Sequence, residues 1–118
     1  VMIEIMSKIK FNKKNMLTTV NNSYATATDL ADWLVKKLGY TFREAYMITG
    51  KIVNYATSKK ILLPNLSLNE LRKFDKNITK NVYYILSPKN SMNSKKSIGG
   101  TSSLIVKKAI QQATKKYL

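Results

Sequence analysis

The side chains of this sequence that could do chemistry are carboxylates, lysines, tyrosines and hydroxyls, because histidine and cysteine are both absent. The chain therefore lacks the commonest general base, the commonest metal ligand and the thiol nucleophile. Asp29 and Asp32 lie three residues apart in a predicted helix, a spacing that could form a paired-acid site. Both fall in the first turn of that helix, where carboxylates stabilise the positive end of the helix dipole. We therefore favour a helix-terminal role for this pair over a catalytic one.

Arg43 and Glu44 are a second charged pair that could be buried. Thr41 stands three residues before Glu44, which is the spacing of a capping box at the start of a helix. The sequence therefore predicts that Glu44 caps the helix and that Arg43 bridges to a neighbouring helix or to Asp32.

The Gly99-Gly100-Thr101 segment precedes a predicted helix and could cradle a phosphate. No strand precedes it and the P-loop spacing is missing, so we favour a loop-to-helix turn in which Thr101 or Ser102 caps the final helix, with Thr101 preferred. The tyrosines are dispersed, which indicates half-buried packing rather than a base-stacking surface. They are Tyr24, Tyr40, Tyr46, Tyr55, Tyr83, Tyr84 and Tyr117.

Helices must position these residues, because apolar side chains recur at helical spacing and no segment shows clear strand alternation. We expect an all-α fold of five to seven helices. The expected helical segments are 1–9, 13–20, 28–38, 42–58, 68–73, 79–86, a turn starting at Pro88, and 101–118. Thr26 or Thr28 can cap the third segment and Gly39 can end it. The predicted core residues are Leu30, Ala31, Leu34, Val35, Leu38, Ala45, Ile48, Ile52, Val53, Ala56, Val82, Ile85, Leu86, Leu104, Ile105, Ala109 and Ile110 or Ala113.

Two helical segments carry features that predict packing partners. Residues 1–9 have almost no polar face, and such a helix is normally buried on several sides, so we expect it to belong to a larger assembly. Gly50 lies inside the segment 42–58 at a cost of about 1 kcal/mol relative to alanine. We therefore expect a crossing helix to approach Gly50 closely.

The size and composition suit one small globular domain, with 118 residues of which 44% are hydrophobic. No run of apolar residues is long enough to span a membrane, and residues 1–11 make a poor signal peptide. The absence of cysteine excludes a disulfide framework and a thiolate metal site, and favours the reducing cytoplasm.

The net charge of +15 invites a nucleic-acid-binding interpretation. Lysine supplies 19 of the 21 positive residues, although arginine is the residue that favours base edges and phosphates. The lysines are scattered in pairs with no basic block, and 11 asparagines and 11 isoleucines accompany them, as an AT-rich genome would encode. We therefore interpret the charge as compositional drift on solvated faces.

Several short motifs resemble the C-terminal domain of argininosuccinate lyase. Residues 26–35 and 42–45 match that family closely. Residues 66–71 are similar to the family's Leu-Ser-Leu-Glu-Glu-Leu, and residues 81–86 to Asp-Val-Tyr-x-x-Leu. Residues 91–101 fit Ser-x-x-x-(Arg/Lys)-x-Ser-x-Gly-Gly-Thr. The order and spacing of the motifs agree along nearly the whole chain.

The resemblance implies an all-α domain of paired helices at residues 25–118, preceded at residues 1–24 by the end of a long central-bundle helix and a connector. It implies that the intact protein is a cytoplasmic homotetramer that cleaves argininosuccinate to arginine and fumarate by β-elimination, without metal or organic cofactor. The family's catalytic regions lie in the N-terminal and central domains, which would be the partners of this chain. The chain is thus expected to hold no catalytic, cofactor-binding or metal-binding residue, and to bind neither nucleic acid nor membrane.

Two departures from the family bear on function. Residues 90–96 superficially resemble the superfamily's catalytic signature, Gly-Ser-Ser-x-Met-Pro-x-Lys-x-Asn-Pro, but the glycine, the proline and the lysine spacing are missing, so Ser91 and Ser94 are assigned no catalytic role. Tyr46-Met47 stands where the family often has two histidines, which are not part of that signature.

Two alternatives come from other functional classes. A basic helical nucleic-acid-binding module would show salt-sensitive binding to duplex or single-stranded nucleic acid. A free-standing protein-interaction domain would fold as a monomer with a stable apolar groove, whereas the lyase interpretation predicts an exposed apolar N-terminal helix. The ordered motifs and the dispersed lysines favour the lyase domain.

Overall fold

The computed structural model describes all 118 residues and is built from helices alone, as predicted. The α-helices are α1 Met2–Lys8, α2 Lys13–Asn21, α3 Ala27–Leu38, α4 Phe42–Ser58, α5 Leu68–Arg72, α6 Val82–Leu86, α7 Pro88–Ser94 and α8 Ser103–Tyr117, with a 3-10 turn at Leu63–Asn65. The expected number of five to seven helices was too low by one, because the turn expected at Pro88 forms a helix of its own, α7. No helix has both the length and the apolar character that a membrane crossing requires.

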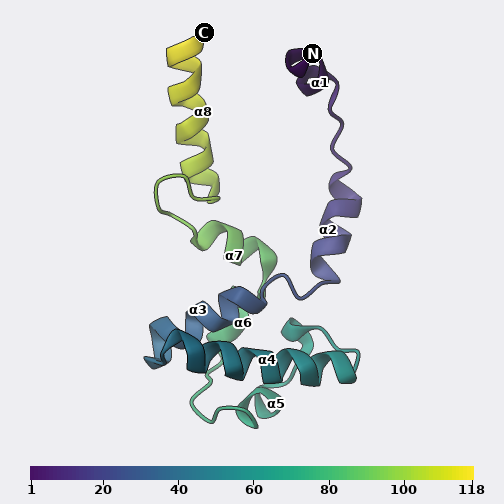
Figure 1. Cartoon of the computed structure of the whole chain (residues 1–118), viewed down its shortest axis with the longest axis vertical. Helices are drawn as coiled ribbons and strands as arrows, with labels where there is room; N and C mark the ends of the chain where they lie inside the picture. Colours follow the sequence, from purple (N-terminus) through teal and green to yellow (C-terminus); the bar gives the residue numbers. More distant parts are fainter.

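The molecule consists of a compact head and two arms (Figure 1). The head contains α3 to α6, while α2 with α1 and α7 with α8 extend from it in the same direction, so that both termini lie at the far end. The principal extents are 54 × 29 × 22 Å. The radius of gyration is 17.8 Å, whereas a compact domain of this length would have about 13.5 Å.

The helical hairpin of α3 and α4 organises the head, and the sequence signals at its turn are confirmed. Gly39 ends α3 in the left-handed conformation, with φ of 75°. The Thr41 N–H donates to Glu44 Oε2 at 2.9 Å, and the Glu44 N–H donates to Thr41 Oγ1 at 3.3 Å, which is the predicted capping box. Thr26 occupies the N-cap position of α3 but makes no capping side-chain hydrogen bond. Arg43 is exposed and forms no ion pair, so its predicted bridge is wrong.

The buried core lies entirely in the head, where α3 contacts both α4 and α6. Most predicted core positions of α3, α4 and α6 are fully buried there, and Val35, Leu38, Ile48, Val53 and Ile85 are partly buried against them. Trp33 is buried although its position was not predicted, because α6 covers a second side of α3. The core residues are Leu30, Ala31, Trp33, Leu34, Ala45, Ile52, Ala56, Leu63, Leu66, Leu71, Ile78, Val82 and Leu86.

The arms depart from the predicted burial. Helix α8 has no buried residue, so the prediction that Leu104, Ile105, Ala109 and Ile110 or Ala113 are core residues is wrong within this chain. Helix α1 forms as predicted but is likewise uncovered on every side. Both helices extend away from the head, and no other part of the chain buries their apolar side chains. Periodicity identified these faces correctly, but it contained no information on what covers them.

Gly50 is a further correction, because nothing lies within 4 Å of the position that a Cβ atom would occupy there. No helix crosses α4 at this glycine. It borders instead a groove between α3 and α4.

Candidate functional site

The predicted paired acids of α3 lie against α7, where they bind residues from the Ser91–Thr101 segment. Ser91 Oγ donates a hydrogen bond to Asp29 Oδ2 at 2.6 Å. Lys95 Nζ lies 2.8 Å from Asp29 Oδ1 and 3.7 Å from Asp32 Oδ2. Lys36 Nζ lies 3.9 Å from Asp32 Oδ2 in a more exposed pair. The hydrogen bond to Asp29 raises the pKa of Lys95 above its ordinary value.

This cluster is suited to holding α7 on α3 rather than to proton transfer. The two carboxylate oxygens of Asp29 are already occupied, one by the Lys95 ammonium and one by the Ser91 hydroxyl. Ser91 has no imidazole or neutral amine beside it that could take its proton. Ser94 Oγ donates only to the Ser91 carbonyl at 2.7 Å. Sequence reasoning did not foresee the contact between Asp29 and Lys95, because the two residues are far apart along the chain and no spacing rule links them.

The Gly99-Gly100-Thr101 segment forms the predicted loop-to-helix turn at the start of α8, but its contacts differ from those expected. Gly99 adopts a φ of 77°. A Cβ atom on Gly100 would lie 2.3 Å from the Lys95 carbonyl oxygen, so only glycine fits without a backbone shift. Ser102, not Thr101, is the N-cap residue of α8, and its N–H donates to the same Lys95 carbonyl at 3.2 Å. Thr101 Oγ1 donates instead to the Met92 carbonyl at 3.1 Å.

A second polar cluster surrounds Glu70, which forms a capping box with Ser67 at the start of α5. The N–H and Oγ of Ser67 donate to Glu70 Oε2 at 2.9 and 2.8 Å. The Tyr55 hydroxyl and Lys59 Nζ each lie 3.1 Å from Oε1. The hydrogen bonds from Ser67, together with those from Lys59 and Tyr55, lower the pKa of Glu70 to about 2. This carboxylate ties α5 to the end of α4 and has no proton to exchange near neutral pH.

The prediction of half-buried tyrosines is right for Tyr24, Tyr40, Tyr55 and Tyr83 and wrong for Tyr46, Tyr84 and Tyr117, which are exposed. The Tyr24 hydroxyl donates to the Ile61 carbonyl at 3.1 Å, and the Tyr83 hydroxyl donates to the Leu66 carbonyl at 2.7 Å. Both rings are half-buried. No group of three or more carboxylate, histidine or cysteine side chains is placed so that it could hold a metal ion.

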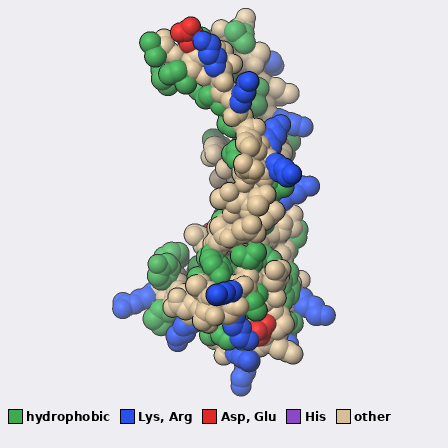
Figure 2. Space-filling view, turned by 90° about the vertical axis from the view of Figure 1, so that its right-hand side faces the viewer, with side chains coloured by type: hydrophobic (Ala, Val, Ile, Leu, Met, Phe, Trp, Pro, Cys, Tyr) green, Lys and Arg blue, Asp and Glu red, His purple; other side chains and the backbone are tan.

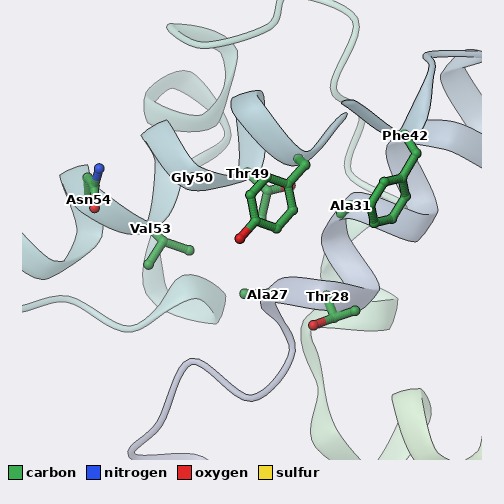
Figure 3. Close-up of a pocket in the computed structure, with 9 residues that line it drawn as sticks. Ala27, Thr28, Ala31, Phe42, Thr49, Gly50, Val53 and Asn54 are labelled. Carbon is green, nitrogen blue, oxygen red and sulfur yellow. The ribbon is translucent and has the colours of Figure 1, made fainter. Parts of the chain in front are cut away.

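The best-formed cavity is a groove of about 330 Å³ between α3 and α4 (Figure 3). Figure 3 shows Phe42, Thr49 and Val53 of α4 facing Ala27 and Ala31 of α3 across it. Its complete lining is Ala27, Thr28, Ala31, Phe42, Tyr46, Thr49, Gly50, Val53 and Asn54. The lining contains no ionisable group except the Tyr46 phenol, so the groove is equipped to bind apolar surface and not to catalyse proton transfer. Apolar spacing did not predict this groove, because Phe42 and Tyr46 lie off the predicted core face.

Comparison with known proteins gives consistent matches. The family model described as "Argininosuccinate lyase C-terminal" matches residues 24–93. The argininosuccinate lyase of Pelagibacter ubique is 48% identical over 112 residues, which are 95% of this chain and 24% of that protein. Those of Ehrlichia ruminantium and Ehrlichia chaffeensis are 44% identical over 93% and 99% of this chain. The chain spans about a quarter of the length of these curated relatives.

Proposed function

Because this chain belongs to the argininosuccinate lyase C-terminal family, we propose that the intact protein cleaves argininosuccinate to arginine and fumarate. The observation that carries the proposal is the 48% identity to an argininosuccinate lyase over 95% of the chain. The reaction is a β-elimination, in which a base removes the proton next to a carboxylate and an acid helps the guanidinium to leave. It requires a positioned base and preorganised donors around the carboxylate.

The catalytic groups belong, in this proposal, to the part of the intact protein outside this chain. Asp29 is occupied by Ser91 and Lys95, and Glu70 by four hydrogen-bond donors. Neither carboxylate is free to act as a base, which supports a noncatalytic role. No organic cofactor or metal is part of the proposed reaction.

The structural role of the chain is to dock on the N-terminal and central domains of the same enzyme and to help shape the active-site cleft. Residues 1–24 are the end of a central-bundle helix with its connector, and residues 25–118 are the C-terminal domain. The exposed apolar side chains of the two arms support this division. They include Ile3, Ile5, Met6, Phe11, Met16, Leu17, Leu104 and Ile110, each at least 50% exposed. A patch of this extent marks an interaction surface.

Further properties of the intact protein follow from the same proposal. We expect a homotetramer, and a cytoplasmic location to which the cysteine-free sequence is suited. The nucleic-acid alternative is not favoured, because Figure 2 shows the lysine and arginine side chains at several separate places on the head and the arm rather than in one patch.

The test compares the intact protein with the 118-residue chain in an assay of fumarate release from argininosuccinate. We expect the intact protein to release fumarate and the chain alone to release none. An intact protein that is folded but does not cleave argininosuccinate would contradict the proposed activity. Fumarate release by the chain alone would contradict its noncatalytic role.

A further inference from the structure

We propose that the groove between α3 and α4 is a docking site for an amphipathic helix with acidic flanks that belongs to the part of the intact protein outside this chain. This inference rests on the proposed function, because it takes the occupant from the remainder of the same enzyme. It concerns the head of the molecule and is separate from the apolar arms.

The shape and lining of the groove fit a helix. Its floor carries small residues from both walls, namely Ala27 and Ala31 of α3 and Gly50 of α4. At Gly50 nothing lies within 4 Å of a Cβ position, so a second backbone could approach α4 there. Phe42 and Tyr46 stand at the rim, with ring centroids 6.2 Å apart. Small residues allow close helix approach, and flanking aromatic rings supply apolar contact area.

Three side chains indicate that the groove is unfilled in the chain alone. Phe42 and Tyr46 are 61% and 67% exposed, although neighbouring positions of α4 belong to the core. Thr49 is only 6% exposed, and its Oγ1 has no hydrogen-bond partner. An unpaired buried hydroxyl is unfavourable, and a polar side chain of an occupant could pair with it. Helix α4 thus presents a largely apolar stripe at 42, 46, 49 and 53 to the groove, next to its core face.

The length of the relatives and the charge of the chain identify the occupant. About three quarters of the length of the argininosuccinate lyases matched lies outside this chain, so most of the surface that could cover the groove belongs there. The chain has a net charge of +15, and five of its six acids already pair or cap within it. Arg43, next to Phe42, is exposed without an acidic partner. A helix that brings acids beside its apolar stripe would complement this surface.

A photo-crosslinker at position 46 of the intact protein tests the proposal. Tyr46→p-benzoylphenylalanine keeps an aromatic ring at the rim, and the purified protein is irradiated and mapped by mass spectrometry. We expect a cross-link to an apolar helical segment with flanking acids, N-terminal to the sequence described here. No cross-link, or one to a segment of another character, would overturn the proposal.

Gly50→Leu provides the second arm, because a leucine has room in the empty groove but would exclude a docked helix. We expect Gly50→Leu to abolish the cross-link from position 46. Lys51→Leu changes a neighbouring exposed residue that does not line the groove, and it should preserve the cross-link. A cross-link that persists in Gly50→Leu would contradict helix docking. Fumarate release by the intact protein with the photo-crosslinker is measured in parallel. Fumarate release without a cross-link would reject only the helix docking in the groove. A cross-link without fumarate release would reject only the lyase function.

Discussion

At the scale of single residues, the side-chain hydrogen bonds of this chain include bonds within one helical turn and bonds between distant segments. Thr41 with Glu44, and Ser67 with Glu70, form the capping boxes that their three-residue spacing predicts. The contacts of Asp29 with Ser91 and Lys95 depend on how α7 returns to α3, which no local pattern encodes. The same limit explains why Ser102, and not the preferred Thr101, occupies the N-cap position of α8, because the Thr101 hydroxyl bonds back to Met92.

Two glycines that look alike in the sequence should respond oppositely to alanine. Gly50→Ala places a methyl group in open space within a helix, and we expect the free energy of unfolding to rise by about 1 kcal/mol. Gly100→Ala forces a methyl group against the Lys95 carbonyl, and we expect a loss of about 1–3 kcal/mol. Urea denaturation of the 118-residue chain measures both. A loss of stability in Gly50→Ala would instead indicate that a helix packs closely against Gly50, as the sequence predicted.

Glu70 should make the stability of the head depend on acidic pH. Its pKa is about 2 in the folded chain, against an ordinary value of 4.5. As the pH falls below about 4.5, the unfolded chain takes up this proton first, so stability present above that pH is lost progressively towards pH 2. Glu70→Gln should flatten this part of the curve of unfolding free energy against pH. Lys59→Met removes one of the four donors to Glu70 and should keep most of the slope of unfolding free energy against pH. An unchanged slope in Glu70→Gln would refute the assignment of this pH dependence to Glu70.

At the scale of elements, apolar periodicity predicts which face of a helix avoids water but not what covers it. Helices α3 and α4 bury their predicted faces against each other and against α6. Helix α8 has an equally clear apolar face, and nothing in the chain covers it. The difference arises from chain direction after the Gly99-Gly100 turn, which leads α8 away from the head (Figure 1).

Matched isoleucine substitutions in α4 and α8 should expose this difference. Ile52 is fully buried, and Ile52→Ala should cost about 2–5 kcal/mol of unfolding free energy in the 118-residue chain. Ile110 is 60% exposed, and Ile110→Ala should change the free energy of unfolding by no more than about 0.5 kcal/mol. Thermal or urea unfolding followed by circular dichroism measures both. Similar costs at the two positions would mean that α8 packs on the head after all.

At the scale of the whole molecule, the exposed arms explain why the chain is so extended. A small domain can bury only part of its surface, and here the buried core is confined to the head. The arms leave apolar side chains of α1, α2 and α8 in water, which is unfavourable unless other surfaces cover them. The chain therefore has the form expected of a part that completes its packing within a larger enzyme.

Small-angle scattering of the 118-residue chain tests this form directly. At low concentration we expect a radius of gyration near 17.8 Å, because nothing in the chain draws α8 onto the head. At higher concentration the exposed apolar faces should associate, and the apparent mass should rise. Leu104→Gln combined with Ile110→Gln should weaken that association, because both side chains are at least 60% exposed on α8. A concentration-independent radius of gyration of about 13.5 Å, the value for a compact domain, would instead show that the arms fold back on the head. The apolar side chains of the arms would then be covered within the chain and could not form the proposed docking surface.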